Sequence, residues 1–218
     1  MRKNTKRKNT AEKNRQALID ATLEAIAELG IAGCSVSEIV QRAGLSRGMI
    51  HLHFDGKENL LIAAVQQTGE NYYAHLDSVL AGSGGLPQHR IAAIIHCDLS
   101  ETILNKRTVN IWYAFRGEAR ERGAIAKFTD TRDKRLNQLI FKAFRIIAET
   151  EGQANTNAVA RDATNGVLAM LEGFWTDYLL HPDAFNRKNA RQIVFRFLAG
   201  LFPLHFSLLG PESNESAV

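Results

Sequence analysis

Apolar residues recur at helical spacing along most of the chain. In the segment from Thr10 to Leu29 they stand three and four residues apart, and Gly30 follows as a stop signal. No sustained run of alternating β-branched residues indicates a sheet, and only four of the 218 residues are proline. The pattern therefore predicts an all-α protein with about nine helices.

The same spacing predicts the later helices. A long helix is expected from Asp55, which stands three residues before Glu58 as in a capping box, to about Leu80. The segment Ala81–Gly85, with the sequence AGSGG, is expected to be a flexible break. Beyond this break, the pattern predicts helices near residues 87–105, 107–121, 125–150, 156–180 and 187–208.

Two short helices joined by a tight turn are predicted over residues 35–54. Ser35 and Glu38 have the spacing of a capping box. Gly44 is expected to end the first helix, and Ser46 to cap the second. This is the pattern of a helix-turn-helix, the motif whose second helix enters the major groove of DNA.

The second of these helices is short, and its residue types favour a groove-entering role. Ile50 and Phe54 are four residues apart and are expected on the core side. The residues expected to be exposed are Arg47, Gly48, Met49, His51 and His53. A glycine in a helix interior costs about 1 kcal/mol relative to alanine, so Gly48 is explained better by close approach to DNA than by stability.

Composition places the chain among globular proteins. The apolar content is 45% and the charged content 23%, which favours a packed core over disorder. No apolar run reaches the roughly 18 residues of a membrane span, and no apolar segment follows the basic N-terminus as it would in a secretory signal. The two cysteines, Cys34 and Cys97, indicate neither a disulfide framework nor a metal site. We therefore expect a cytoplasmic protein without membrane contact.

The N-terminus carries most of the charge asymmetry. The first 15 residues contain seven lysines and arginines against the single acid Glu12. Such a segment can bind an anionic polymer electrostatically, or it can be a solvated tail. Composition alone leaves both interpretations open.

An enzyme is the first alternative function, and the lack of catalytic motifs disfavours it. The chain contains no H-E-x-x-H, no G-x-S-x-G and no glycine-rich phosphate loop. His51 and His53 are two residues apart, so on a helix they point about 200° from each other and do not share a ligand. We expect no catalytic residue, no metal site and no cofactor.

The segment Gly33–Val65, with the sequence GCSVSEIVQRAGLSRGMIHLHFDGKENLLIAAV, resembles the DNA-binding signature of the TetR family of transcriptional regulators. The resemblance implies phosphate contacts at Ser35, Ser37 and Lys57, and base reading by Arg47. It also implies that the backbone N–H of Ser46 faces a phosphate and that Met49 contacts a thymine methyl. The implied DNA-binding set is Ser35, Ser37, Ser46, Arg47, Gly48, Met49, His51, His53 and Lys57. His51 departs from the tyrosine common in the family, so its role is either a phosphate or a base contact.

The C-terminal part is similar to the ligand domain of the betaine-synthesis repressor (BetI-type) subfamily. The segments that carry this likeness are IWYAFRGEA at 111–119, RDKRLNQLI at 132–140 and GVLAMLEGFWTDYLLHPDAFN at 166–186. The implied effector is choline or a related cation, held in an aromatic cage. The candidate cage residues are Trp112, Tyr113, Phe115, Phe174, Trp175 and Tyr178, with negative charge from Glu118, Glu172 and Asp177. Ordinary core packing is the alternative interpretation for each aromatic residue.

Two stripes of small or apolar residues near the C-terminus are expected to pack either against the core of the chain or against a helix of a partner chain. Small residues recur at Gly166, Ala169 and Gly173, and apolar residues at Ile193, Phe197, Leu201 and Leu204. In the family the last two helices pair across a two-fold axis, which implies a homodimer and a pseudo-palindromic DNA operator.

The predicted organisation is a basic N-terminal arm over 1–12, a DNA-binding domain over 13–58, a ligand-binding and dimerisation domain over 59–208 and a flexible tail over 209–218. The predicted function is that of a transcriptional regulator, a repressor that binds double-stranded DNA operators. A small-molecule effector is expected to control this binding by shifting the helix between residues 58 and 80. The alternative is a helical DNA-binding architectural protein without an effector. The aromatic-rich domain after Gly85 disfavours that alternative, because architecture alone does not need it.

Overall fold

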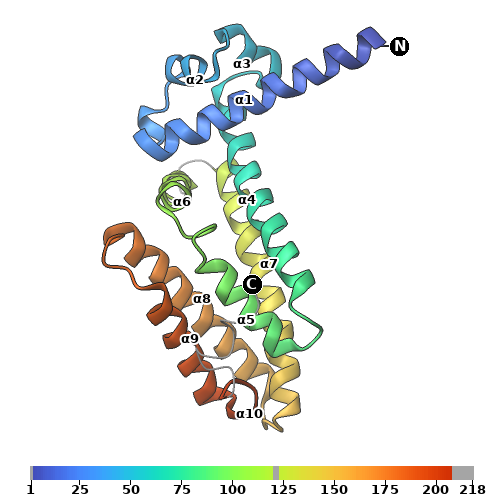
Figure 1. The fold of residues 1–218 in the computed structure, drawn as a ribbon, viewed down its shortest axis with the longest axis vertical. Coiled ribbons are helices and arrows are strands. Elements are labelled where there is room, and N and C mark those ends of the chain that lie inside the picture. Colours follow the sequence, from blue (N-terminus) through green and yellow to red (C-terminus); the bar gives the residue numbers. More distant parts are fainter. Residues whose placement is uncertain (1, 120–122, 208–218) are drawn as a thin grey trace. The chain divides into compact units, whose positions relative to one another are not determined.

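The computed structural model describes residues 2–119 and 123–207 (Figure 1). Within these ranges the chain forms ten helices and no strand, which confirms the all-α prediction. The helices are α1 (Arg2–Gly33), α2 (Val36–Ala43), α3 (Arg47–Phe54), α4 (Lys57–Gly82), α5 (Pro87–Asp98), α6 (Lys106–Ala119), α7 (Gly123–Thr150), α8 (Thr156–Leu180), α9 (Arg187–Leu201) and α10 (Pro203–Phe206). No described helix is long and apolar enough to cross a membrane.

The chain divides into two compact units. The first contains residues 1–71 and 107–130, and the second contains residues 72–106 and 131–218. The helices α4 and α7 contribute residues to both units. Most of α6 therefore clusters with the N-terminal helices, although the sequence placed it inside the domain predicted over 59–208.

The core of the first unit is built from one face of each of its helices. Leu18 and Ile26 of α1, Ile39 of α2 and Leu60 of α4 are buried there, and Phe115 of α6 joins them. A side-chain amide adds a polar link, because Asn110 Nδ2 on α6 donates to the Ala27 carbonyl on α1 over 2.9 Å. The unit is therefore a helix-turn-helix bundle to which α6 is packed.

The first helix differs at both ends from its prediction. It begins at Arg2 instead of near Thr10, and the lysines and arginines among residues 2–10 favour helix. In Figure 1 the blue start of α1 extends beyond the helices α2 and α3. Gly30 is the predicted break, with φ 68° and ψ 176°, and one further helical turn follows as far as Gly33. The predicted basic arm is thus the first part of α1.

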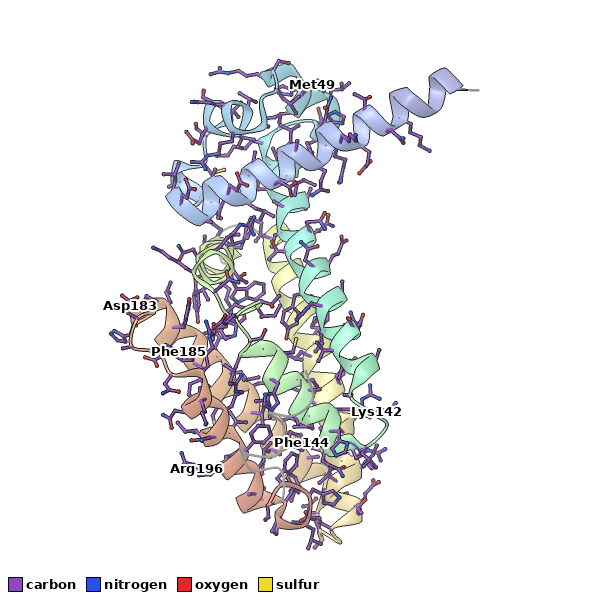
Figure 2. The ribbon with its side chains drawn as sticks, in the orientation of Figure 1. Met49, Lys142, Phe144, Asp183, Phe185 and Arg196 are labelled. Carbon is purple, nitrogen blue, oxygen red and sulfur yellow. The ribbon has the colours of Figure 1, made fainter. Side chains whose placement is uncertain are left out.

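The second unit is closed by the C-terminal helices. Phe144 of α7 stacks on Phe202 with ring centroids 5.4 Å apart, and Phe206 packs against both rings. Figure 2 labels Phe144, which is buried, and Lys142, which is exposed, on the same helix.

The helix predicted over 187–208 is divided in two. It ends at Leu201, and the short α10 begins at Pro203. Proline lacks the backbone N–H that would continue the helix, and it pushes the residue before it out of the helical conformation. Phe202 accordingly has φ −134° and ψ 69°. Residues 209–218, the predicted flexible tail, lie outside the described residues.

Candidate nucleic-acid interface and effector region

The turn between α2 and α3 follows from three local signals. Ser35 Oγ accepts from the Glu38 backbone N–H over 3.1 Å, which confirms the predicted N-cap of α2. Gly44 ends α2 in the left-handed conformation, with φ 63° and ψ 30°, and the Leu45 N–H returns to the Val40 carbonyl. Three residues then separate the two helices, as the sequence predicted.

An eight-residue helix such as α3 depends on its packing. The side chains of Ile50 and Phe54 are buried in the core of the first unit. The Arg15 guanidinium on α1 lies 5.2 Å from the centre of the Phe54 ring, a cation–π contact between the first helix and the end of α3. Asp55 then ends α3 in the left-handed conformation, with φ 57°. These contacts determine how α3 presents its opposite face.

A charged network joins α1 to α2. The Arg42 guanidinium donates to Glu38 over 2.7 Å and to Glu28 over 2.8 Å. The hydrogen bond from Arg42, together with its positive charge, holds the pKa of the Glu28 carboxyl below its ordinary value. Glu28 is exposed, so this network orients the two helices more than it stabilises the fold.

The exposed face of α3 contains polar, small and apolar residues. Arg47, Gly48, His51 and Leu52 are exposed on it. Gly48 and Leu52 are four residues apart and lie on the side opposite Ile50, because each helical residue turns the chain by about 100°. Leu52 is 73% exposed, which is unusual for a large apolar side chain.

The structure brings Arg47 and Ser37 together. The Arg47 guanidinium on α3 donates to the Ser37 hydroxyl on α2. Ser35, Ser37 and Ser46 are exposed, and Lys57 is half-buried as the first residue of α4. The exposed polar residues predicted from the sequence therefore occupy the α2–α3 surface.

Two of the predicted DNA-binding side chains are less exposed than expected. Met49, labelled in Figure 2, is half-buried and packs against the core of the first unit. His53 is also half-buried, and its Nε2 is buried without a hydrogen-bond partner in the described part of the chain. Around the helix axis, both residues lie next to the buried side that carries Ile50 and Phe54, so the core covers them in part.

Ser46 is the N-cap residue of α3, as the sequence predicted, but its side chain does not cap the helix. Ser46 has the extended backbone of an N-cap residue, and its carbonyl accepts from the Met49 N–H over 3.0 Å. Its hydroxyl makes no capping hydrogen bond. The hydroxyl proton and the first N–H groups of α3 can therefore donate to an anion such as a phosphate.

Leu52 was missed by the sequence prediction. The signal was present, because Leu52 lies one turn after Gly48 and therefore shares its exposed face. An apolar side chain on a groove-entering helix fits the C5-methyl group of thymine.

The six candidate cage residues belong to different environments. Phe115 is fully buried in the core of the first unit, so it contributes to core packing there. Trp112 is also buried, with the Arg116 guanidinium 5.8 Å from its ring centre, and Tyr113 is half-buried. All three are on α6, within the first unit.

The other three candidates are on α8, in the second unit. Phe174 and Tyr178 pack edge-on against Phe185, with ring centroids 6.4 and 5.5 Å away. The Arg187 guanidinium lies 5.0 Å from the Tyr178 ring centre and donates to the Leu104 carbonyl over 2.7 Å. Figure 2 labels Phe185 in the turn after α8. Trp175 is buried elsewhere on α8.

Trp175 belongs to a buried network that the sequence did not reveal. Its indole Nε1 donates to Asp98 Oδ2 over 2.8 Å, and the Tyr72 hydroxyl donates to Asp98 Oδ1 over 3.0 Å. Asp98 is 1% exposed. The acids expected to supply negative charge are different, because Glu172 and Asp177 are exposed and Glu118 is half-buried.

Comparison with known families assigns both halves of the chain. Residues 18–64 match the family described as bacterial regulatory proteins, tetR family, and residues 87–203 match the BetI-type transcriptional repressor C-terminal family. The second match alone spans more than half of the chain. The chain belongs to the TetR family. It is a transcriptional regulator of BetI type and not an enzyme.

Individual relatives agree with this assignment. The HTH-type transcriptional regulator BetI 2 of Chromohalobacter salexigens is 30% identical over 188 residues, which cover 84% of this chain and 86% of that protein. The regulator BetI of Stenotrophomonas maltophilia is 27% identical over 185 residues, with coverages of 84% and 90%.

Two solved structures are similar in fold. A transcriptional regulator from Pseudomonas aeruginosa has a TM-score of 0.77 at 27% identity, covering 90% of this chain and 94% of that one. A transcriptional regulator from Saccharomonospora viridis, solved in complex with choline, has a TM-score of 0.71 at 18% identity, with coverages of 84% and 94%.

Two glycines of this TetR-family motif are expected to respond oppositely to alanine. Gly44 is in the left-handed region, so Gly44→Ala should destabilise the fold by about 1 kcal/mol. At Gly48 an added Cβ would meet only Ser46 Oγ, at 3.9 Å, so Gly48→Ala should stabilise the fold by up to about 1 kcal/mol while weakening DNA binding. Chemical denaturation and fluorescence anisotropy measure the two effects. Gly69→Ala in α4 is the control, because it should leave DNA affinity unchanged.

Leu52→Ala is expected to remove a preference for thymine. A contact with one methyl group contributes about 0.8 kcal/mol, or roughly fourfold in affinity. Replacing the contacted thymine by deoxyuridine, in an operator selected from a random DNA library, should weaken wild-type binding by that factor and leave Leu52→Ala unaffected. Leu86→Ala, at another exposed leucine, is the control. Equal sensitivity of wild type and Leu52→Ala to deoxyuridine would contradict the prediction.

Proposed function

We propose that the protein is a homodimeric, cytoplasmic repressor whose binding to a pseudo-palindromic operator is controlled by a quaternary ammonium effector such as choline. The proposal rests on which side of α3 is buried and which side is exposed. Its apolar side is buried in the first unit, while Arg47, Gly48 and Leu52 are exposed beside the exposed serines of α2. This arrangement, in a chain of the TetR family, supports major-groove binding.

The proposed division of roles follows from the side chains on this surface. Arg47 is the candidate for base reading, because a guanidinium that bonds two acceptors of guanine is the commonest specific contact. Ser35 accepts a hydrogen bond at its oxygen and retains a hydroxyl proton that can donate to a phosphate. Ser37, Ser46, His51 and Lys57 are proposed as further phosphate contacts, which position the protein without reading sequence.

The proposed dimer uses α8 and α9, which pack against each other in the second unit. The ring of Phe197 covers Gly166, where a Cβ would come within 2.5 Å of it, so Gly166 serves this packing within the protomer. Leu180 and Ile193 remain exposed. Gly173 and Gly200 are also exposed, and an added Cβ at either would meet no atom within 4 Å. Leu204 does not extend the predicted stripe, because it lies in α10.

The class of effector is proposed from two considerations. The BetI-type match covers the C-terminal half, and a relative in fold has been solved with choline. The aromatic rings of the second unit also hold cations of the chain itself. The Arg135 guanidinium lies 4.2 Å from the Tyr73 ring centre, and Arg187 lies over Tyr178. Ring faces that accept a guanidinium present the electrostatic surface that attracts a quaternary ammonium.

Two helices are candidates for the coupling between effector and DNA. α4 begins three residues after the end of α3 and continues to Gly82. α6 is joined to the first unit by Phe115 in its core and by the hydrogen bond from Asn110 to Ala27 on α1. A shift of either helix would change how α3 is held, and a coupling of about 1–3 kcal/mol would be ordinary for an effector.

Arg47→Ala tests the DNA-binding proposal. With the selected operator, its affinity should fall by about 5- to 150-fold, corresponding to 1–3 kcal/mol, and its sequence preference should relax. Because Arg47 is exposed, the melting temperature should change little. Arg145→Ala, at an exposed arginine paired with Glu149 on α7, is the matched control. Full retention of operator affinity by Arg47→Ala would exclude this residue from the interface, and failure to select any preferred sequence would favour an architectural protein.

The effector proposal is tested by ligand panels. Choline, betaine aldehyde and glycine betaine should raise the melting temperature in proportion to their affinity, and at least one should change operator affinity. Polyamines without a quaternary ammonium are the control ligands. The effector class is wrong if no quaternary amine stabilises the protein at concentrations far above a typical dissociation constant.

A further inference from the structure

The start of α1 carries a dense positive charge. Among the first 15 residues of the chain, seven are lysine or arginine and only Glu12 is acidic. Because α1 begins at Arg2, the basic residues from Arg2 to Arg15 belong to one helix. Residues 8–13 are all exposed, so packing within the described part of the chain does not explain this stretch of α1.

This charge opposes the helix that carries it. Lysine and arginine each favour helix as residue types, but cations are unfavourable at a helix start, and the first turn of α1 contains no acid. Arg2 and Lys6 are four residues apart, as are Lys3 and Arg7, and like charges at this spacing destabilise a helix. The free chain thus bears an electrostatic cost that an anionic partner would remove.

The charged segment of α1 starts beside the recognition helix. The Arg15 guanidinium lies 5.2 Å from the centre of the Phe54 ring, at the end of α3. Lys8 is exposed and stands about two helical turns, or roughly 10 Å, before Arg15, so it lies on the same side of α1. In Figure 1 α1 continues past α2 and α3 to its blue start. A DNA duplex bound by α3 would therefore lie close to the base of this segment.

Double-stranded DNA is the anionic partner that fits this segment. Its phosphates place one negative charge on about every 1.7 Å of the duplex axis. The stretch from Arg2 to Arg15 spans about 20 Å of helix, which is long enough to reach several phosphates. Lysine and arginine side chains that contact phosphates add affinity without reading sequence.

We propose that residues 2–13 of α1, here called the basic extension, form a second DNA-binding surface that contacts duplex phosphates beyond those reached from α2 and α3. This inference rests on the proposed DNA binding by α3 and specifies a further contact on the same duplex. The basic extension contributes affinity for any sequence and makes that affinity salt-dependent. Sequence preference stays with α3.

The test replaces four basic residues of the extension by glutamine, which favours helix about as well as lysine and arginine. The substitutions are Lys3→Gln, Lys6→Gln, Arg7→Gln and Lys8→Gln, combined in one full-length variant. Fluorescence anisotropy measures the affinity for a random-sequence duplex between about 50 and 200 mM salt.

The expected result is a weaker salt dependence. Each lost phosphate contact lowers the slope of log affinity against log salt by about 0.9, so the loss of two to four contacts lowers it by about 1.8 to 3.6. Over this roughly fourfold range of salt, wild-type affinity should therefore fall about 12- to 150-fold further than that of the variant.

A matched control removes the same number of positive charges from the second unit. It combines substitutions at four exposed positions, Arg90→Gln, Lys106→Gln, Lys134→Gln and Lys142→Gln. The control should keep the wild-type salt slope, because charges far from the duplex are screened by salt. The variant of the basic extension should melt no lower than wild type, because its substitutions remove repulsion between like charges.

Two outcomes of the salt titration would overturn the proposal. One is an unchanged slope in the variant of the basic extension; if that variant also lost binding to vesicles of anionic phospholipid, the extension would be a membrane-binding surface instead. The other is an equal loss of slope in the control, because net charge would then be the cause.

The selected operator separates this inference from the proposed function. In the variant of the basic extension, the ratio of operator affinity to random-sequence affinity should stay within about twofold of wild type, because phosphate contacts do not read sequence. A larger fall in this ratio would overturn the assignment, since the extension would then read bases. If Arg47→Ala keeps its operator affinity, or no operator is selected, the proposed function fails, while the salt slope on random-sequence DNA still decides the role of the extension.

Discussion

The burial of Ile50 and Phe54 is the interaction on which the DNA-binding surface depends. An isolated helix of eight residues is not stable in water, so α3 depends on its packing, and these two side chains are its buried ones. Burying a large apolar side chain contributes about 1.5–3 kcal/mol, which is ample to hold so short an element. Because the core side provides this stability, the opposite side is free to carry a glycine and an exposed leucine, both of which are poor choices for a helix surface.

The two glycines of the motif illustrate two separate physical reasons for the same residue. At Gly44 the backbone has a positive φ, and an added Cβ would meet no atom within 4 Å. Conformation alone requires glycine there. Gly48 is in an ordinary helix with open space around it, so nothing inside the protomer requires glycine. A requirement at Gly48 must therefore come from a partner outside the chain.

The parts of the structure that follow from local rules could be predicted from the sequence. Ser35 caps α2 and Gly44 ends it because each acts on residues within five positions of itself. The end of α9 at Leu201 also follows from a local rule, the effect of Pro203, although the apolar spacing alone predicted a continuous helix. Whether Met49 or Leu52 is the covered side chain depends on how the other helices of the first unit pack around Ile50, which periodicity does not specify.

The buried Asp98 could not be predicted, because its surroundings come from distant parts of the chain. In the sequence it is an ordinary polar residue at a helix end, and Tyr72 and Trp175 belong to two other helices. A partly satisfied polar cluster in a core is costly, whereas a fully bonded one specifies a single arrangement. The two hydrogen bonds of Asp98 join the end of α5 to α4 and α8, so this carboxylate specifies how the three helices pack. The helix α4 contains both Tyr72 and, at its first turn, the residues that follow the recognition helix, so one continuous element contains this buried contact and the junction with α3.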